Sequence, residues 1–360
     1  SDVCSSDLID CGGRLVIPGL VDCHTHLCFG GWRGDEFEQR LQGRTYQEIA
    51  SAGGGIRSTV SATRAATTDE LREKALDALN EVLALGVTTL ECKSGYGLEP
   101  VTELKQLEIY QQVNSMQAID LVPTFLGAHM VPPEYQENRQ AYIKLLCEEI
   151  IPEVARRNLA RFCDIFIEKG AYDIEEAHQV LGAARDAGLA LKVHADQLSD
   201  GGGARFAADM QATSAEHLEY ANEEGIAALA GSGTVAVSLP LASLYLNEAY
   251  MPARKMLHAG VRVAVATDFN PGSAPSFHLP LAMMLACVNQ RMTPQEVLMG
   301  ATSVAARALA LENHIGSLQP RFNADIAIID APNLNHWLYH FRANACVGVV
   351  KSGRWQLRSF

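Results

Sequence analysis

The sequence predicts an α/β fold: a (β/α)8 TIM-like barrel with a small β-sandwich element formed by the chain ends. Two observations lead to this prediction. Short β-rich apolar runs alternate with longer helical patterns, which is typical of parallel strands joined by helices. No GxGxxG glycine fingerprint follows the first apolar run, which disfavours the rival architecture, an open doubly wound sheet.

The candidate barrel strands are eight apolar runs, and eight is the number that closes such a barrel. The sixth run, "ATSAEH", is the weakest. The runs cover residues 15–23, 86–93, 120–127, 162–168, 189–194, 212–217, 233–238 and 261–267.

Helical patterns fill the gaps between these runs. Residues 67–86 begin at a capping threonine, carry early acidic residues and end at a glycine, and residues 139–157 show a second such pattern. After a last helical stretch at 293–311, the tail becomes β-like. We therefore expect a non-native or residual β segment at 1–14, the barrel at 15–312, and the C-terminal β segment of a small second domain at 313–360.

Composition narrows the range of partners. The chain has 360 residues and a formal net charge of -13, so nucleic acids and anionic membrane surfaces would repel it, and a small-molecule substrate remains. No apolar run reaches the roughly 18 residues of a membrane span. Nine cysteines without CxxC pairs argue against a disulfide framework and favour a cytoplasmic protein.

Polar residues stand where the predicted strands end. In a barrel of this kind, catalytic groups lie just past the carboxyl ends of the strands. Five of the eleven histidines and one aspartate occupy these points. They are His24, His26, His129, His194, His217 and Asp268.

Four of these residues suggest a metal site. Strand alternation puts His24 and His26 on one face, and His194 and Asp268 add a third imidazole and a carboxylate. This donor set suits one metal ion per chain, zinc or iron, because imidazole and carboxylate serve both. Two readings of His217 stay open: a group that binds the metal or polarises a substrate carbonyl, or a structural histidine bonded to a backbone carbonyl.

Several motifs in order resemble the amidohydrolase superfamily of metal-dependent hydrolases, and within it most closely the imidazolonepropionase family of histidine degradation. They are "PGLVDCHTH", "HTHLCFGGWRGDEF", "GGGI", "ECKSGYGL", "AHMVPPEY", "HADQLSDGGGA", "AEHLEY", "TDFNPGS" and "HWLYHF". Together they run from about residue 15 to the C-terminus.

The resemblance implies a site and a reaction. His24, His26, His194 and Asp268 would bind the metal, and the ring amide of 4-imidazolone-5-propanoate would be hydrolysed to N-formimidoyl-L-glutamate. Asp268 would carry the proton, and His217 would stabilise the developing oxyanion. Arg33 has the planar fork that suits the substrate carboxylate. The implied substrate pocket comprises Arg33, Tyr46, Tyr96, His129, Gln197, Asn270, Gly272 and Ser273.

Three departures from the family pattern are visible. Gln197 stands where some members carry glutamate, so we expect it to orient the ring by hydrogen bonds rather than act as a base. Many members of the superfamily bridge two metal ions with a modified lysine at the end of the fourth strand. Here Lys169 follows Glu168 and should point to the opposite face, away from the site, which favours one metal over two. The N-terminal β segment that should pair with the tail strands is truncated, so these strands are expected to keep an unpaired edge.

Two rival functions remain. Another cyclic amidohydrolase, or a heterocycle deaminase of the same superfamily, would share the metal chemistry, but its neutral substrate would have no use for Arg33 as a carboxylate anchor. A non-catalytic scaffold would be expected to lack the metal ligands, and all four are present. The family resemblance also implies a homodimer.

Overall fold

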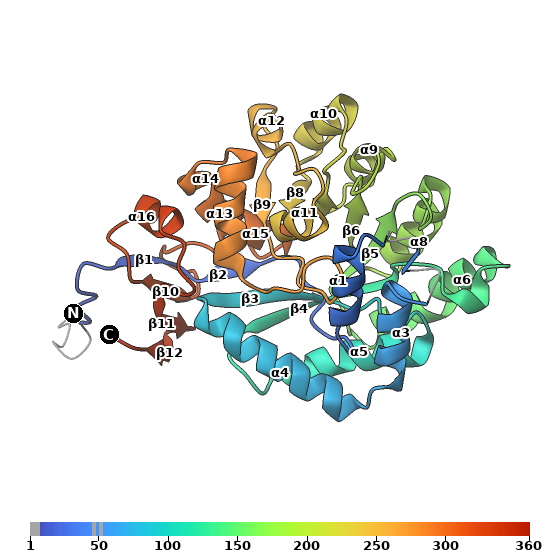
Figure 1. Cartoon of the computed structure of the whole chain (residues 1–360), viewed down its shortest axis with the longest axis horizontal. Coiled ribbons are helices and arrows are strands. Elements are labelled where there is room, and N and C mark those ends of the chain that lie inside the picture. Colours follow the sequence, from blue (N-terminus) through green and yellow to red (C-terminus); the bar gives the residue numbers. More distant parts are fainter. Residues whose placement is uncertain (1–7, 45–47, 50–52) are drawn as a thin grey trace.

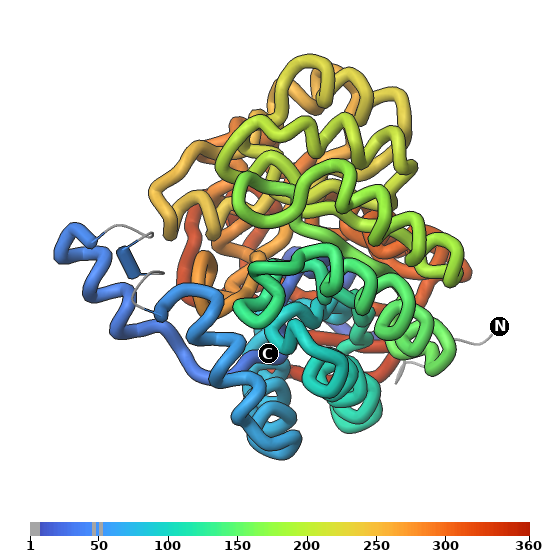
Figure 2. Tube along the Cα trace, turned by 90° about the vertical axis from the view of Figure 1, so that its right-hand side faces the viewer, coloured from blue at the N-terminus to red at the C-terminus, as the bar shows by residue number. Residues whose placement is uncertain are grey.

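The computed structural model describes residues 8–44, 48–49 and 53–360, and it confirms the predicted (β/α)8 barrel. Eight parallel strands follow one another in chain order around the barrel, and helices surround them (Figures 1 and 2). The strands are β2 (Leu20–Asp22), β3 (Val87–Lys93), β4 (Asp120–Ala128), β5 (Phe162–Ile167), β6 (Ala190–Ala195), β7 (Ser214–His217), β8 (Val235–Ser238) and β9 (Val263–Val265).

The seam of the barrel, between the last strand and the first, closes just beyond the strands themselves. Thr25 forms a parallel bridge with Phe269, and the His26 amide donates to the Phe269 carbonyl at 2.8 Å. Asp22, which is fully buried, accepts hydrogen bonds from both the amide and the hydroxyl of Thr267. The carboxyl end of the barrel, where the site lies, is therefore tied together by its own loops.

Helices cover the outside of the barrel. The predicted helix at 67–86 is confirmed as α4, whose N-cap Thr67 forms a capping box with Glu70. The pattern at 139–157 forms α6, a π-helical turn (Leu146–Ile150) and α7 in succession. The helices before β6 are α1 (Gly34–Leu41), α3 (Ile56–Ala65), α4 (Thr68–Ala84), α5 (Pro100–Asn114), α6 (Arg139–Leu145), α7 (Ile151–Arg156) and α8 (Ile174–Asp186).

The remaining helices follow β6. A short 3-10 turn at Pro133–Tyr135 lies earlier, after β4. The helices after β6 are α9 (Gly203–Asp209), α10 (Glu223–Ser232), α11 (Pro240–Leu246), α12 (Ala253–His258), α13 (Leu279–Gln290), α14 (Pro294–Gly300), α15 (Ser303–Ala308) and α16 (Leu334–Tyr339).

A small antiparallel sheet stands beside the barrel, near both chain ends (Figure 1). Its strand order is β1-β10-β11-β12, so the β-like tail expected from the sequence does form strands. The edge of β10 is covered by β1, which differs from the expectation that the tail would keep it unpaired. The strands are β1 (Leu15–Pro18), β10 (Ile326–Ile329), β11 (Cys346–Lys351) and β12 (Arg354–Arg358).

The run at 15–23, which we expected to be one barrel strand, is divided between the two sheets. The Gly19 amide donates to Asp325 beside the small sheet, and the next amide, of Leu20, donates to Gly86 in the barrel. A Cβ on Gly19 would lie 2.3 Å from the Thr88 hydroxyl, so only glycine fits where the chain passes between sheets. β1 and β2 are therefore separate strands that are joined through Gly19.

Two other expectations can be compared with the structure. The eight cysteines in the described part of the chain are all free thiols, in agreement with the predicted lack of a disulfide framework. Among the described helices, none has the length and apolar character needed to cross a membrane.

Candidate metal centre and substrate pocket

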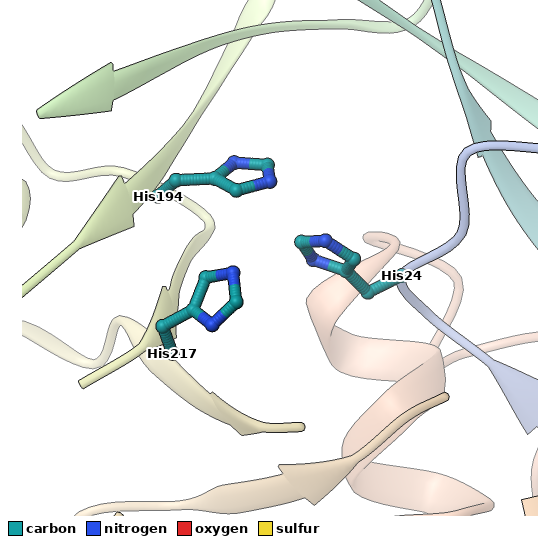
Figure 3. A group of neighbouring side chains, drawn as sticks. All are labelled: His24, His194 and His217. Atoms are coloured by element: carbon teal, nitrogen blue, oxygen red, sulfur yellow. The ribbon is translucent and has the colours of Figure 1, made fainter. Parts of the chain in front are cut away.

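Three histidines from three barrel elements converge at the carboxyl end of the barrel (Figure 3). His24 follows β2, His194 lies on β6 and His217 ends β7. One ring nitrogen of each lies within 4.8 Å of the others, and all three side chains are buried. Three of the polar residues predicted at strand ends therefore lie together at one end of the barrel.

His24 also belongs to a second group, with His26 and Asp268. The Asp268 Oδ1 atom lies 3.3 Å from His24 Nε2 and 3.5 Å from His26 Nε2. The expected ligands therefore gather around His24, whose ring centroid lies 4.6 Å from that of His194 and 5.3 Å from that of His26. Because His217 also lies within reach, the geometry admits five donors rather than four.

The ring nitrogens fit a metal ion. Buried polar atoms in proteins almost always have hydrogen-bond partners. Within residues 8–44, 48–49 and 53–360, Nε2 of His24, both nitrogens of His194 and Nδ1 of His26 lack a hydrogen bond of good geometry. A cation with nitrogen and oxygen ligands would satisfy such a cluster.

The electrostatics of these groups suit ligation. Burial opposes the ionised form of Asp268, but its contacts with His24 and His26 hold the pKa of that carboxyl well below its usual range. Burial lowers the pKa of His194 well below its usual range, so this ring is neutral at pH 7, as a ligand must be. Burial likewise opposes protonation of His24, yet Glu216 and Asp268 raise its pKa to about 9.

The backbone at the site is strained. Asp268 has a φ of 59° and His217 a φ of 77°, both in the left-handed region that residues other than glycine rarely adopt. Such conformations cost on the order of 1–3 kcal/mol each and gather at functional sites. Both residues belong to the groups that could hold a metal ion.

A polar turn holds Asp268 in place. The Asn270 side chain donates to the Asp268 carbonyl at 2.6 Å and accepts from the amides of Gly272 and Ser273. The Ser273 hydroxyl donates to Asp268 Oδ2 at 3.2 Å. Asn270 and Ser273, expected in the substrate pocket, thus have a clear structural role in orienting the carboxylate.

Arg33 lies directly against this turn. Its Nε donates to the Thr59 hydroxyl at 2.8 Å, and a Cβ on Gly272 would lie 2.3 Å from its Nη1 atom. The guanidinium is half-buried and packs where only glycine leaves room. The structure therefore brings Arg33, 239 positions away in the sequence, against Gly272 in the turn that holds Asp268.

Tyr96 and His129 line the side of the site next to His26. The His129 ring stacks on that of His26 with centroids 5.2 Å apart, and the Tyr96 ring lies 5.4 Å from His129. His129 Nδ1 lies 3.0 Å from the Gly95 carbonyl, and burial lowers the His129 pKa to about 3. His129 is therefore neutral, and Nδ1 donates to that carbonyl.

The other expected residues differ in their placement. Gln197 is half-buried in the loop after β6, three residues beyond His194. Tyr46 lies outside the described residues. Lys169 is exposed, whereas Glu168 accepts hydrogen bonds from the amides of Leu198 and Ser199, in agreement with the expectation that Lys169 points away from the site.

Sequence reasoning missed a buried carboxylate beside His217. The Glu219 Oε1 atom lies 3.6 Å from His217 Nδ1 and accepts a hydrogen bond from the Ser243 hydroxyl at 3.3 Å. It also missed five charged residues inside the barrel, described below. The sequence did contain an indication of these buried charges, because charged residues interrupt apolar strand runs such as "TLECK" and "LALKVH".

Comparison with known proteins places this site in a family. Residues 15–356 match the amidohydrolase family, which is most of the chain. The chain belongs to the amidohydrolase family. Amidohydrolases typically bind a metal ion, and the histidines and Asp268 at the barrel mouth are the candidate metal site of this chain.

Curated amidohydrolase relatives narrow the comparison. The imidazolonepropionase of Treponema denticola is 49% identical over 348 residues, which cover 96% of this chain and 84% of the relative. That of Symbiobacterium thermophilum is 48% identical over 349 residues, covering 96% and 82%. This is the subgroup that the sequence motifs predicted.

Solved structures with this fold are more distant. A 5-methylcytosine deaminase from Klebsiella pneumoniae superposes with a TM-score of 0.77 at 18% identity, covering 99% of this chain and 90% of the other. A triazine hydrolase variant gives a TM-score of 0.76 at 17% identity, covering 97% and 84%. Both show the same barrel fold as this chain.

Proposed function

We propose that the chain hydrolyses the ring amide of 4-imidazolone-5-propanoate to N-formimidoyl-L-glutamate, the reaction of its imidazolonepropionase relatives. The observation that carries this proposal is the position of Arg33. Its guanidinium packs on Gly272, four residues beyond Asp268, so a cationic fork stands at the rim of a metal-binding histidine cluster. A cation in this position would bind the carboxylate of a substrate whose ring amide faces the metal site.

The metal would be held by His24, His26, His194 and Asp268, with His217 within reach as a fifth donor. Three imidazoles and one carboxylate suit zinc or iron. When bound, the ion would supply a water whose pKa is lowered toward about 7 and would polarise the ring carbonyl.

Asp268 is the proton carrier in this proposal. Its Oδ2 atom accepts from Ser273, whereas Oδ1 faces the two histidines, so the carboxylate is oriented at both ends. It takes the proton of the attacking water and returns it to the departing ring nitrogen. His217, held near Glu219, stabilises the negative charge that develops on the carbonyl oxygen.

The substrate carboxylate would bind Arg33, which Thr59 orients through Nε. Tyr96 and His129 form the wall of the ring pocket, and the Gln197 amide offers a donor and an acceptor to the ring. Tyr46 is retained as a further candidate from the family resemblance. Asn270, Gly272 and Ser273 complete the pocket by shaping the turn against which Arg33 lies.

A substrate panel tests this proposal against a heterocycle deaminase. The purified protein would be assayed with 4-imidazolone-5-propanoate, with the same ring lacking the propanoate, and with guanine and cytosine. We expect consumption of the first substrate at a kcat/KM at least 100-fold above that of the others. Faster turnover of a neutral heterocycle would overturn the proposal.

A further inference from the structure

Five charged side chains fill the barrel interior beneath the histidine cluster, and all are fully buried. Lys192 precedes His194 by two residues on β6, so both side chains point into the barrel, and Lys192 lies further from the carboxyl end of the strand. Buried charges are tolerated only where they are paired. The five, referred to as the charged layer, are Glu91, Lys93, Asp164, Lys192 and Glu216.

Lys93 is the centre of the charged layer. Its Nζ atom lies 2.8 Å from Asp164 Oδ2, 3.0 Å from Glu216 Oε2 and 3.0 Å from Glu91 Oε1. The Lys192 Nζ atom lies 3.0 Å from the second carboxylate oxygen of Glu216, Oε1. Burial opposes the charge on Lys93, but the three carboxylates outweigh it and hold the Lys93 pKa well above its usual range.

Two carboxylates of the layer also touch the histidine cluster. Glu216 Oε2 lies 3.0 Å from His24 Nδ1, and Asp164 Oδ2 lies 2.9 Å from His194 Nδ1. Both approaches are oblique to the ring N–H bonds. The two oxygens that contact the rings are the same two that bind Lys93, so one ammonium group fixes both carboxylates.

We propose that Lys93 is a positioning residue that acts through Glu216 and Asp164 to orient His24 and His194 for metal binding. The inference rests on the metal site of the proposed function. Each carboxylate favours a proton on the Nδ1 atom it faces, which leaves Nε2 of that ring available for the ion. Without Lys93, the two carboxylates would repel each other and turn away from the rings.

The position of the layer gives it this role rather than a purely structural one. A second buried pair, Lys351 with Asp325 in the small sheet, has a similar separation of 2.7 Å but no contact with a histidine. Groups that orient metal-binding histidines typically change metal affinity by about 10- to 100-fold. The pair in the small sheet should have no such effect, so it provides a matched control.

The experiment measures metal binding directly, without substrate. Chelator-stripped protein would be titrated with Co²⁺ in competition with a chromophoric chelator, and the visible spectrum of the bound cobalt recorded. The variants are Lys93→Gln, which removes the charge but keeps a donor, and Glu216→Asp, which keeps the charge but withdraws it from His24. Asp164→Asn tests the second arm, and Asp325→Asn is the control.

We expect Lys93→Gln, Glu216→Asp and Asp164→Asn each to bind cobalt about 10- to 100-fold more weakly, with an altered visible spectrum. Asp325→Asn should match the wild type in both. Because Lys93 acts through Glu216, the loss in the Lys93→Gln/Glu216→Asp double variant should be smaller than the product of the single losses. Glu216→Asp keeps every charge of the layer, so it tests the inference even if Lys93→Gln does not fold.

Wild-type cobalt affinity and spectrum in folded Glu216→Asp and Asp164→Asn would overturn the inference, even if Lys93→Gln lowered the thermal stability. If the wild-type protein itself bound no cobalt, the proposed function would fail instead. The two failures are therefore distinguishable.

Discussion

Asp268 is joined to His24 twice: its backbone amide donates to the His24 carbonyl at 3.0 Å, and its Oδ1 atom lies 3.3 Å from His24 Nε2. The first contact helps to close the barrel between its last and first strands, and the second lies within the candidate metal site. The bridge between Thr25 and Phe269 lies beside them. The closing seam of the barrel is thus also the place where the site is assembled.

Asp268→Asn should abolish turnover while leaving the protein folded. Asparagine keeps the size and the backbone hydrogen bond but cannot carry a proton, and acid–base catalysis contributes about 10²- to 10⁴-fold. We expect kcat for 4-imidazolone-5-propanoate to fall by at least about 100-fold, measured as loss of ultraviolet absorbance, with an unchanged circular dichroism spectrum. Activity near that of the wild type would remove Asp268 from its assigned role.

Arg33→Met should weaken binding of the carboxylate substrate. A hydrogen bond to a charged group contributes about 1.5–3 kcal/mol, so we expect KM to rise about 10- to 100-fold. Arg33→Lys should give a smaller rise, because it keeps the charge but loses the planar fork. An unchanged KM in Arg33→Met would mean that Arg33 is a structural residue.

Gly272→Ala should raise KM as the Arg33 variants do, because it disturbs the same contact between residue 272 and Arg33. The new methyl group would lie 2.3 Å from Arg33 Nη1 and displace the guanidinium. We expect KM to rise while the cobalt affinity stays at the wild-type value. Gly34→Ala is the control, because its methyl group would meet nothing within 4 Å although it adjoins Arg33 in sequence. A normal KM in Gly272→Ala would show that this contact does not position Arg33.

Gly19→Ala should destabilise the fold. Its Cβ would lie 2.3 Å from the Thr88 hydroxyl at the point where the chain passes between the two sheets. Overpacking of this kind costs about 1–3 kcal/mol, which urea unfolding would measure. Gly182→Ala, in α8 with nothing within 4 Å of the new methyl group, should be neutral or stabilising. Equal stability of the two variants would contradict the assigned role of Gly19.

The sequence predicted the barrel and the histidine cluster well because both follow from local periodicity. The strand alternation that put His24 and His26 on one face, and the polar residues at strand ends, needed no knowledge of long-range contacts. The division of residues 15–23 into two strands was not predicted. It depends on Thr88, whose hydroxyl excludes any side chain at position 19, and this contact is visible only in three dimensions.

The charged layer was missed for a different reason. A lone charge in an apolar run, such as Lys93 or Asp164, normally weakens the case for a buried strand. Only the barrel brings such residues from separate strands together, so that each charge finds its partners.

The most direct test of the account compares metal-loaded and chelator-stripped samples of one preparation, followed by the ultraviolet absorbance of 4-imidazolone-5-propanoate. We predict turnover in the loaded sample, none in the stripped sample, and recovery when one equivalent of zinc or iron is returned. Equal turnover in both samples, or none in a sample with one metal bound per chain, would contradict the account.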